Sequence, residues 1–323
     1  MKTLRLTSRD LGLLDKLGEH RFLDVRQVAA LAFPSEDAAR HRLHELLGHR
    51  LVHRLYMPVR PYDPRAVNVY ALSAKGARHV PRSRADAARP ATLSTSDRRS
   101  GLFLDHTLRR NDVRITLERL GETHPKFTML NWKQRREDVE FRTTDVRGRR
   151  QRIVPDGVAY VRVGPEVEVL PIEIDMGTVR LPKMTARYKG YWRDFTEGGP
   201  RVRHGPVPYR VLTITNTRAR LEALRTAAQR APTRGRRGSR LFWFALLDDI
   251  DIQAPDKLLG SIWKHAGYQP DGATSTPEPL FPNLDSSQAV YDLHPKTTLP
   301  PTWRRSEVPP SASVPAAPAF PLR

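Results

Sequence analysis

The sequence predicts an α+β protein with two domains, a linker between them and an irregular, proline-rich tail. The chain has 323 residues, which suits two domains of ordinary size. Leucines at helical spacing dominate residues 1–80, whereas strand-like and helical stretches alternate over residues 102–252. Residues 81–101 have no apolar face and are expected to form the linker, and residues 253–323 form the tail, part of it irregular.

Basic residues strongly outnumber acidic residues. The chain has 55 lysines and arginines against 35 aspartates and glutamates, which gives a formal net charge of +20, and most of the cations are arginine. Because guanidinium groups bind phosphate and guanine well, we expect a nucleic-acid partner. The alternative is that GC-rich coding DNA raises the arginine content without any such partner.

Composition also excludes several classes of protein. The chain has no cysteine, which excludes disulfides, thiolate zinc sites, iron–sulfur clusters and a cysteine nucleophile. No apolar run approaches the roughly 18 residues of a membrane span, and the first residues are charged, unlike a signal peptide. We therefore expect a cytoplasmic protein without a membrane partner.

Helices are predicted at residues 7–17, at residues 24–33 and from Ser35 to about Gly48. Each begins at a Thr, Ser or Asp that can cap it, and a glycine or a proline follows each one. The third has two acids in its first turn, where the helix dipole favours them. Its leucines form one stripe, and the side facing away from that stripe carries Arg40, His41 and His44. This pattern is typical of a DNA-recognition helix.

Two extended runs follow the third helix, Leu51–Val59 and Asn68–Leu72, and a turn rich in Pro, Asp and Arg separates them. Helices followed by such a hairpin predict a winged helix-turn-helix, whose third helix enters the major groove while the wing touches the backbone. The alternative is a small helical core with a solvated basic face. The closing segment resembles that of bacterial winged-helix proteins, at Tyr70, Leu72, Ser73 and Gly76. The expected DNA contacts are Arg40, His41, His44, Arg50, Arg54 and Arg60.

The central region predicts a helix, three strands, a helix and a further strand, followed by another helix and a last buried strand. The ranges are 102–120, 126–132, 152–163, 166–176, 180–195, 208–215, 217–231 and 240–247. The α-β-β-β-α-β order is that of the restriction-endonuclease-like fold. Lys183, Arg187 and Tyr191 share one stripe of the second helix.

A carboxylate pattern accompanies this order. Asp156 follows Pro155, and Glu173 lies inside an apolar strand. Nucleases of the PD-(D/E)xK type hold Mg²⁺ with two such acids on adjacent strands, and a Lys two residues after the Glu polarises the water. Here that position is Asp175. The expected site therefore holds Mg²⁺ or Mn²⁺ with Asp156, Glu173 and Asp175, and Lys183 or Arg187 lies near the scissile phosphate.

Two other interpretations of these residues are open. Asp156 could lie in a turn, with Glu173 and Asp175 as strand-end acids paired with Arg180 or Lys183. Tyr188 and Tyr191 could attack a DNA strand as nucleophiles, although aromatic residues at helical spacing usually belong to a core.

Over residues 5–195 the chain resembles the bacterial replication-relaxation family. The resemblance rests on the order of several pieces rather than on any one of them. After the winged-helix opening, they are the segment 104–108 with Asn111 and Asp112, Trp132 with Glu137, the segment 155–157, and Glu173-x-Asp175-x-Gly177-Thr178 before a basic helix containing Tyr191. The resemblance implies a winged-helix DNA binder fused to a nuclease-like domain.

The expected function is double-stranded DNA binding by a protein of plasmid, phage or mobile-element type, in replication or DNA relaxation. An active Mg²⁺- or Mn²⁺-dependent endonuclease and a winged-helix transcriptional regulator are the alternatives. Besides DNA, the expected partners are a second copy of the chain or replication and mobilisation proteins.

Overall fold

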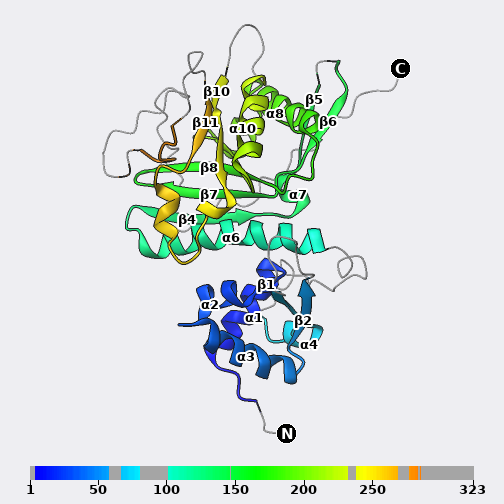
Figure 1. Cartoon of the computed structure of the whole chain (residues 1–323), viewed down its shortest axis with the longest axis vertical. Helices are drawn as coiled ribbons and strands as arrows, with labels where there is room; N and C mark the ends of the chain where they lie inside the picture. The colour runs from blue at the N-terminus through cyan, green and yellow to red at the C-terminus, as the bar shows by residue number, and fades with distance from the viewer. Residues whose placement is uncertain are drawn as a thin grey trace.

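The computed structural model describes residues 4–57, 67–80, 101–145, 147–231, 238–267, 276–282 and 284. It is an α+β structure in which an N-terminal unit of helices with a small sheet precedes a larger unit built on a mixed sheet. Helix α6, Gly101–Thr123, lies between the two units (Figure 1). The predicted linker, apart from Gly101, and the tail beyond residue 284 lie outside the described residues.

The N-terminal unit forms its helices where the caps predict them. The helices are α1 (Ser8–His20), α2 (Val25–Ala32), α3 (Glu36–Gly48) and the short α4 (Ala74–Ala77). Side-chain oxygens of Thr7, Asp24 and Ser35 accept hydrogen bonds from the first turns of the first three helices. Helix α1 continues past Gly18, because an interior glycine costs a helix only about 1 kcal/mol, and it ends where Arg21 has a φ of 69°.

A small antiparallel sheet completes this unit. Strands β2 (Val52–Met57) and β3 (Val67–Leu72) pair along their whole length, and the short β1 (Leu23–Asp24) pairs with the other edge of β3. The predicted turn between the two long strands lies outside the described residues. The order of helices and hairpin in the described part matches the prediction.

The larger sheet has the strand order β11-β10-β9-β8-β7-β4 in the described part of the chain. Strands β4, β7 and β8 are antiparallel neighbours, β9 and β10 run parallel to β8, and β11 returns antiparallel at the edge. Their bounds are Phe127–Lys133 for β4, Gly157–Val163 for β7, Glu166–Asp175 for β8, Val211–Thr215 for β9, Gly238–Leu246 for β10 and Lys264–Gly267 for β11.

Helices cover both faces of this sheet. Alternate residues of β8 pack on opposite sides: Leu170 and Ile172 contact the core that includes α6, whereas Val167 and Val169 contact the core of α8 (Leu181–Thr196) and α10 (Arg218–Gln229). The other elements are short: α7 (Arg136–Val139), α9 (Gly199–His204), the hairpin of β5 (Phe141–Thr144) and β6 (Arg150–Ile153), and the 3₁₀ turns Leu247–Asp249 and Pro255–Leu259.

Two parts of the larger unit differ from the sequence prediction. The strand expected over 152–163 is split into β6 and β7, because Pro155 has no N–H to donate and Asp156 turns the chain. Residues beyond 252, assigned to the tail, add β11 to the sheet, and Trp263 and Phe281 to its core. None of the described helices is long and apolar enough to cross a membrane.

Candidate functional site

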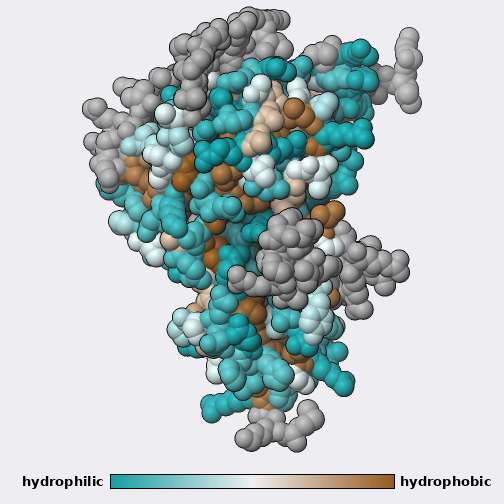
Figure 2. Space-filling view, viewed as in Figure 1, coloured by the Kyte–Doolittle hydropathy of each residue, from teal (hydrophilic) through white to brown (hydrophobic). Residues whose placement is uncertain are grey.

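The first candidate site is a basic surface on the N-terminal unit. On α3, Ala39, Leu43 and Leu46 are fully buried, so the helix turns its other side outward. That side exposes Arg40, His41 and His44, as predicted. Hydrophilic residues also cover most of this unit in the view of Figure 2.

Strand β2 adds to the same surface. Arg54 is exposed and lies over the ring of Tyr56, with 5.0 Å between the guanidinium carbon and the ring centroid, and Tyr56 is 64% exposed. Burial raises the pKa of Tyr70, while the charges of Arg54 and Arg40 oppose that rise. We call Arg40, His41, His44, Arg54 and Tyr56 the basic face.

The two remaining predicted DNA contacts, Arg50 and Arg60, are not part of the basic face. Arg50 is exposed between α3 and β2 with a φ of 60°, and Arg60 lies outside the described residues. Arg40 itself forms ion pairs with Asp37 and Glu36 on its own helix. Such exposed pairs are weak, so a phosphate can replace these acids as the partner of Arg40.

The second candidate site surrounds Asp156. Its backbone N–H donates to the carbonyl of Ile172 (2.9 Å), and its Oδ2 accepts from the N–H of Ile174 (2.8 Å), so it is tied to the end of β8. His106 of α6 approaches from the other side, with Nε2 3.3 Å from Asp156 Oδ2. Burial acts to lower the pKa of His106, but Asp156 has the larger, opposite effect, so the pKa of His106 is raised. In turn, His106 lowers the pKa of the Asp156 carboxyl against the effect of burial.

Glu173 is nearly fully buried and faces α8. Its Oε1 accepts from Arg187 Nε (2.8 Å) and from the hydroxyl of Tyr191, and Arg187 also donates to the carbonyl of Val154. Burial raises the pKa of Glu173 to about 7, and the nearby charge of Asp156 adds to the rise. The structure therefore brings together Asp156, Glu173 and Arg187 of the predicted site.

Asp175 is committed to a different set of partners. Arg220 of α10 donates to both of its carboxylate oxygens (2.9 and 3.0 Å), and Thr215 Oγ1 and the N–H of Gly177 donate as well. Lys183 is exposed on α8. The alternative interpretation, in which Glu173 and Asp175 pair with basic residues, is thus close to the structure. The partners are Arg187 and Arg220 rather than Arg180 and Lys183.

These residues do not fit the predicted three-carboxylate cage for Mg²⁺ or Mn²⁺. Among the described His, Asp and Glu side chains, only Glu19, His20 and Glu118 bring three ligand atoms within 4.8 Å of one another. That group is already part of an ion network, because Lys16 (2.9 Å) and Arg114 (2.7 Å) bind the Glu118 carboxylate.

Tyr188 and Tyr191 are fully buried, so neither hydroxyl is placed to attack a DNA strand.

A comparison with known families covers both candidate sites as far as residue 208. The model of the replication-relaxation family matches residues 14–208, more than half of the chain. The chain belongs to the replication-relaxation family. No curated protein and no solved structure matches it.

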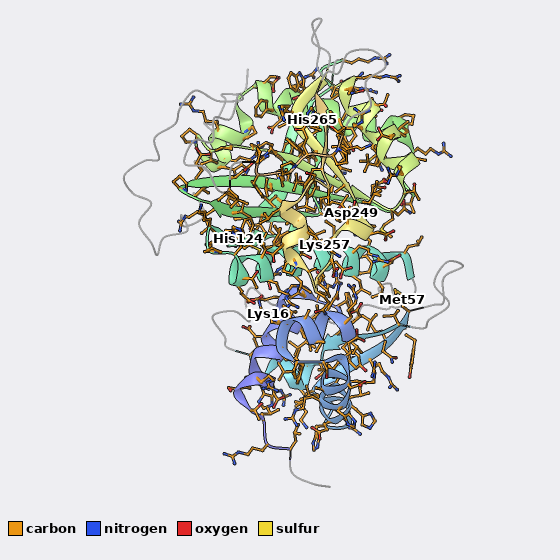
Figure 3. All side chains as sticks on the ribbon, turned by 60° about the vertical axis from the view of Figure 1, so that its left-hand side comes forward. Lys16, Met57, His124, Asp249, Lys257 and His265 are labelled. Atoms are coloured by element: carbon orange, nitrogen blue, oxygen red, sulfur yellow. The ribbon has the colours of Figure 1, made fainter. Side chains whose placement is uncertain are left out.

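In this replication-relaxation protein, the segment 104–112 of α6 joins the two units. Asn111 Nδ2 donates to the backbone carbonyls of His20 (3.1 Å) and Phe22 (2.6 Å), and Asp112 accepts from Arg26 (2.6 Å) and Gln27 (2.8 Å). Figure 3 shows Lys16 and Met57 at this boundary. The segment is recognisable in the sequence but its role is not, since nothing local to it indicates that its partners lie in α1, in α2 and in the residues between them.

Proposed function

We propose that this replication-relaxation protein binds double-stranded DNA through the basic face. The observation that carries the proposal is that α3 buries one side completely and exposes Arg40, His41 and His44 on the other. The order of the helices and the β2–β3 hairpin is that of a winged helix-turn-helix, in which the third helix enters the major groove and the hairpin contacts the backbone. The excess positive charge of the chain supports the same partner.

The setting we propose for this binding is the replication or relaxation of plasmid, phage or other mobile DNA in the cytoplasm. The larger unit would be carried to the DNA by the N-terminal unit, since the contacts of α6 hold the two together.

A duplex titration at about 50 mM and about 200 mM salt tests DNA binding. We expect affinity that falls steeply with salt, and at least about tenfold weaker binding with a shallower salt slope for the double variant Arg40→Ala, Arg54→Ala. The control double variant, Arg142→Ala with Arg149→Ala, removes the same charge from two exposed arginines of the larger unit. Absent binding at low salt, or equal weakening by both double variants, would overturn the proposal.

A nuclease function has one observation in its favour. Helix α6, strands β4, β7 and β8, helix α8 and strand β9 follow the restriction-endonuclease-like order, and Asp156 and Glu173 lie at adjacent strands within it. Against it, Arg187 and Tyr191 occupy Glu173, and Asp175 is paired with Arg220. Incubation of supercoiled plasmid with Mn²⁺ decides the question: identical products from the wild type and Asp156→Ala would remove this alternative.

A further inference from the structure

Cationic side chains from two helices gather around Asp156. His106 and Arg110 come from α6, and Arg187 comes from α8. His106 Nε2 lies 3.3 Å from Asp156 Oδ2, and the charge of Asp156 acts on both arginines. The two helices lie on opposite faces of the sheet, and Asp156 lies at the ends of the inner strands β7 and β8.

Arg110 is the member of this cluster whose hydrogen bonding is incomplete. Its Nε is shielded from solvent and has no hydrogen-bond partner in the described part of the chain. Burial lowers the pKa of Arg110 to about 10, with the charges of Arg114 and Arg21 acting in the same direction and the charge of Asp156 opposing them only in part. A buried donor without an acceptor is costly, so Arg110 is suited to bind an acceptor that is supplied from outside.

The acids of the cluster are already used by other donors. Asp156 accepts from the backbone of Ile174 and pairs with His106, and Glu173 accepts from Arg187 and Tyr191. Three cationic groups therefore share two carboxylates. The site is also open, since the side chain of His106 is 30% exposed and Arg110 is partly exposed.

We propose that His106 and Arg110, one turn apart on α6, form an anion site that binds a phosphate group, and that its natural ligand is a backbone phosphate of DNA. A forked guanidinium matches the oxygens of a phosphate, and an imidazolium adds a further charged donor. The inference rests on the proposed DNA binding for the source of the phosphate, but the site itself is independent of the basic face.

The site is tested first without DNA, by thermal unfolding of the full-length protein with inorganic phosphate or with chloride at equal ionic strength. We expect phosphate to raise the Tm of the wild type and to lose this effect in Arg110→Gln and His106→Gln. The matched control is Arg119→Gln on the same helix, whose guanidinium is bonded to Gln253. Equal stabilisation of the wild type and Arg110→Gln by phosphate, or none in the wild type, would overturn the site.

The second measurement identifies the source of the phosphate. We expect Arg110→Gln to reduce the salt slope of duplex binding by about one unit relative to the wild type and to Arg119→Gln. An unchanged slope beside a lost phosphate effect would assign the site to free phosphate and overturn its role in DNA binding. If Arg110→Gln loses its native circular dichroism, the variant Arg110→Lys is measured instead, because Lys keeps the charge but lacks the forked guanidinium. A phosphate effect that is not weakened in Arg110→Lys would overturn the site. Failure of DNA binding by the basic face would leave the phosphate result unaffected.

Discussion

At the scale of single residues, buried titratable groups define the contact between α1 and α6. His20 is fully buried there, neither ring nitrogen has a hydrogen-bond partner in the described part of the chain, and Nε2 is 3.7 Å from Glu118 Oε1. Burial and the charge of Arg114 lower the pKa of His20 to about 4. The ring is therefore neutral at neutral pH, although Glu118 lies beside it.

This shift predicts a loss of stability in mild acid. The unfolded state protonates His20 near its ordinary pKa of about 6.5, whereas the folded state does so only near 4. The contribution of His20 is thus fully present above about pH 6.5 and falls as the pH drops toward 4, by about 2 kcal/mol between pH 7 and pH 5. Urea unfolding at the two pH values measures this loss.

The variant His20→Gln separates this effect from that of other groups. Glu173, whose pKa is raised to about 7, acts in the opposite direction, because its contribution grows as the pH falls from 7 toward its ordinary value. We expect His20→Gln to lose less stability than the wild type between pH 7 and pH 5. An identical loss in both proteins would contradict the burial of a neutral ring.

At the scale of elements, the short helix α4 shows why the closing segment of the N-terminal unit has a glycine at position 76. Ser73 caps α4 through the N–H of Gly76 (2.9 Å) and donates to the carbonyl of Arg50 (2.7 Å). A Cβ at Gly76 would lie 2.1 Å from the backbone oxygen of Leu51 and 2.9 Å from Leu72 Cδ1. The close approach of α4 to the residue before β2 thus closes the N-terminal unit and leaves no room for a side chain.

Gly76→Ala is therefore expected to lower the free energy of unfolding by about 2 kcal/mol, because the backbone of Leu51 must move. Gly12→Ala in α1 is the matched control: its Cβ would meet nothing within 4 Å, and alanine should stabilise the helix by up to about 1 kcal/mol. Urea unfolding of both variants gives the comparison. A Gly76→Ala protein as stable as the control would show that α4 does not pack this closely.

At the scale of the whole molecule, α6 belongs to the cores of both units. Val113 and Leu117 pack against the large sheet, whereas Leu104 and Leu108 pack with Phe22 and neighbours from the N-terminal unit. Polar contacts reinforce this, since Arg114 pairs with Glu19 (2.8 Å). A helix buried on both sides therefore couples the stability of the two units.

Asn111→Leu should weaken this coupling. The change removes the side-chain N–H donor that bridges the carbonyls of His20 and Phe22, at a cost of about 2 kcal/mol. We expect calorimetry to show the N-terminal unit unfolding at a lower temperature than the large sheet. Glu122→Ala, an exposed position on the same helix, should leave a single transition; two transitions in both variants, or one in both, would contradict the role of Asn111.

Much of this protein follows from its sequence because the forces involved are local. The caps at Thr7, Asp24 and Ser35 and the outward side of α3 depend on residues within about one helical turn, so periodicity and capping patterns predict them. The strand that carries Glu173 follows in the same way from an apolar run, whereas the strand expected over 152–163 is split at Pro155. The family is also recognisable from the sequence, because its motifs follow one another along one stretch of the chain, and the match of the family model confirms it.

Only the tertiary structure decides which charges meet. Asp175 pairs with Arg220 and Glu173 with Arg187 because α10 and α8 pack on one face of the sheet, and no local pattern relates these partners. The buried pair of Arg210 and Glu168 also joins distant residues, one directly before β9 and the other in β8. Isolated buried charges are costly, so residues far away in the sequence must supply a partner for each of them. For this reason the acids expected to hold a metal ion form ion pairs instead.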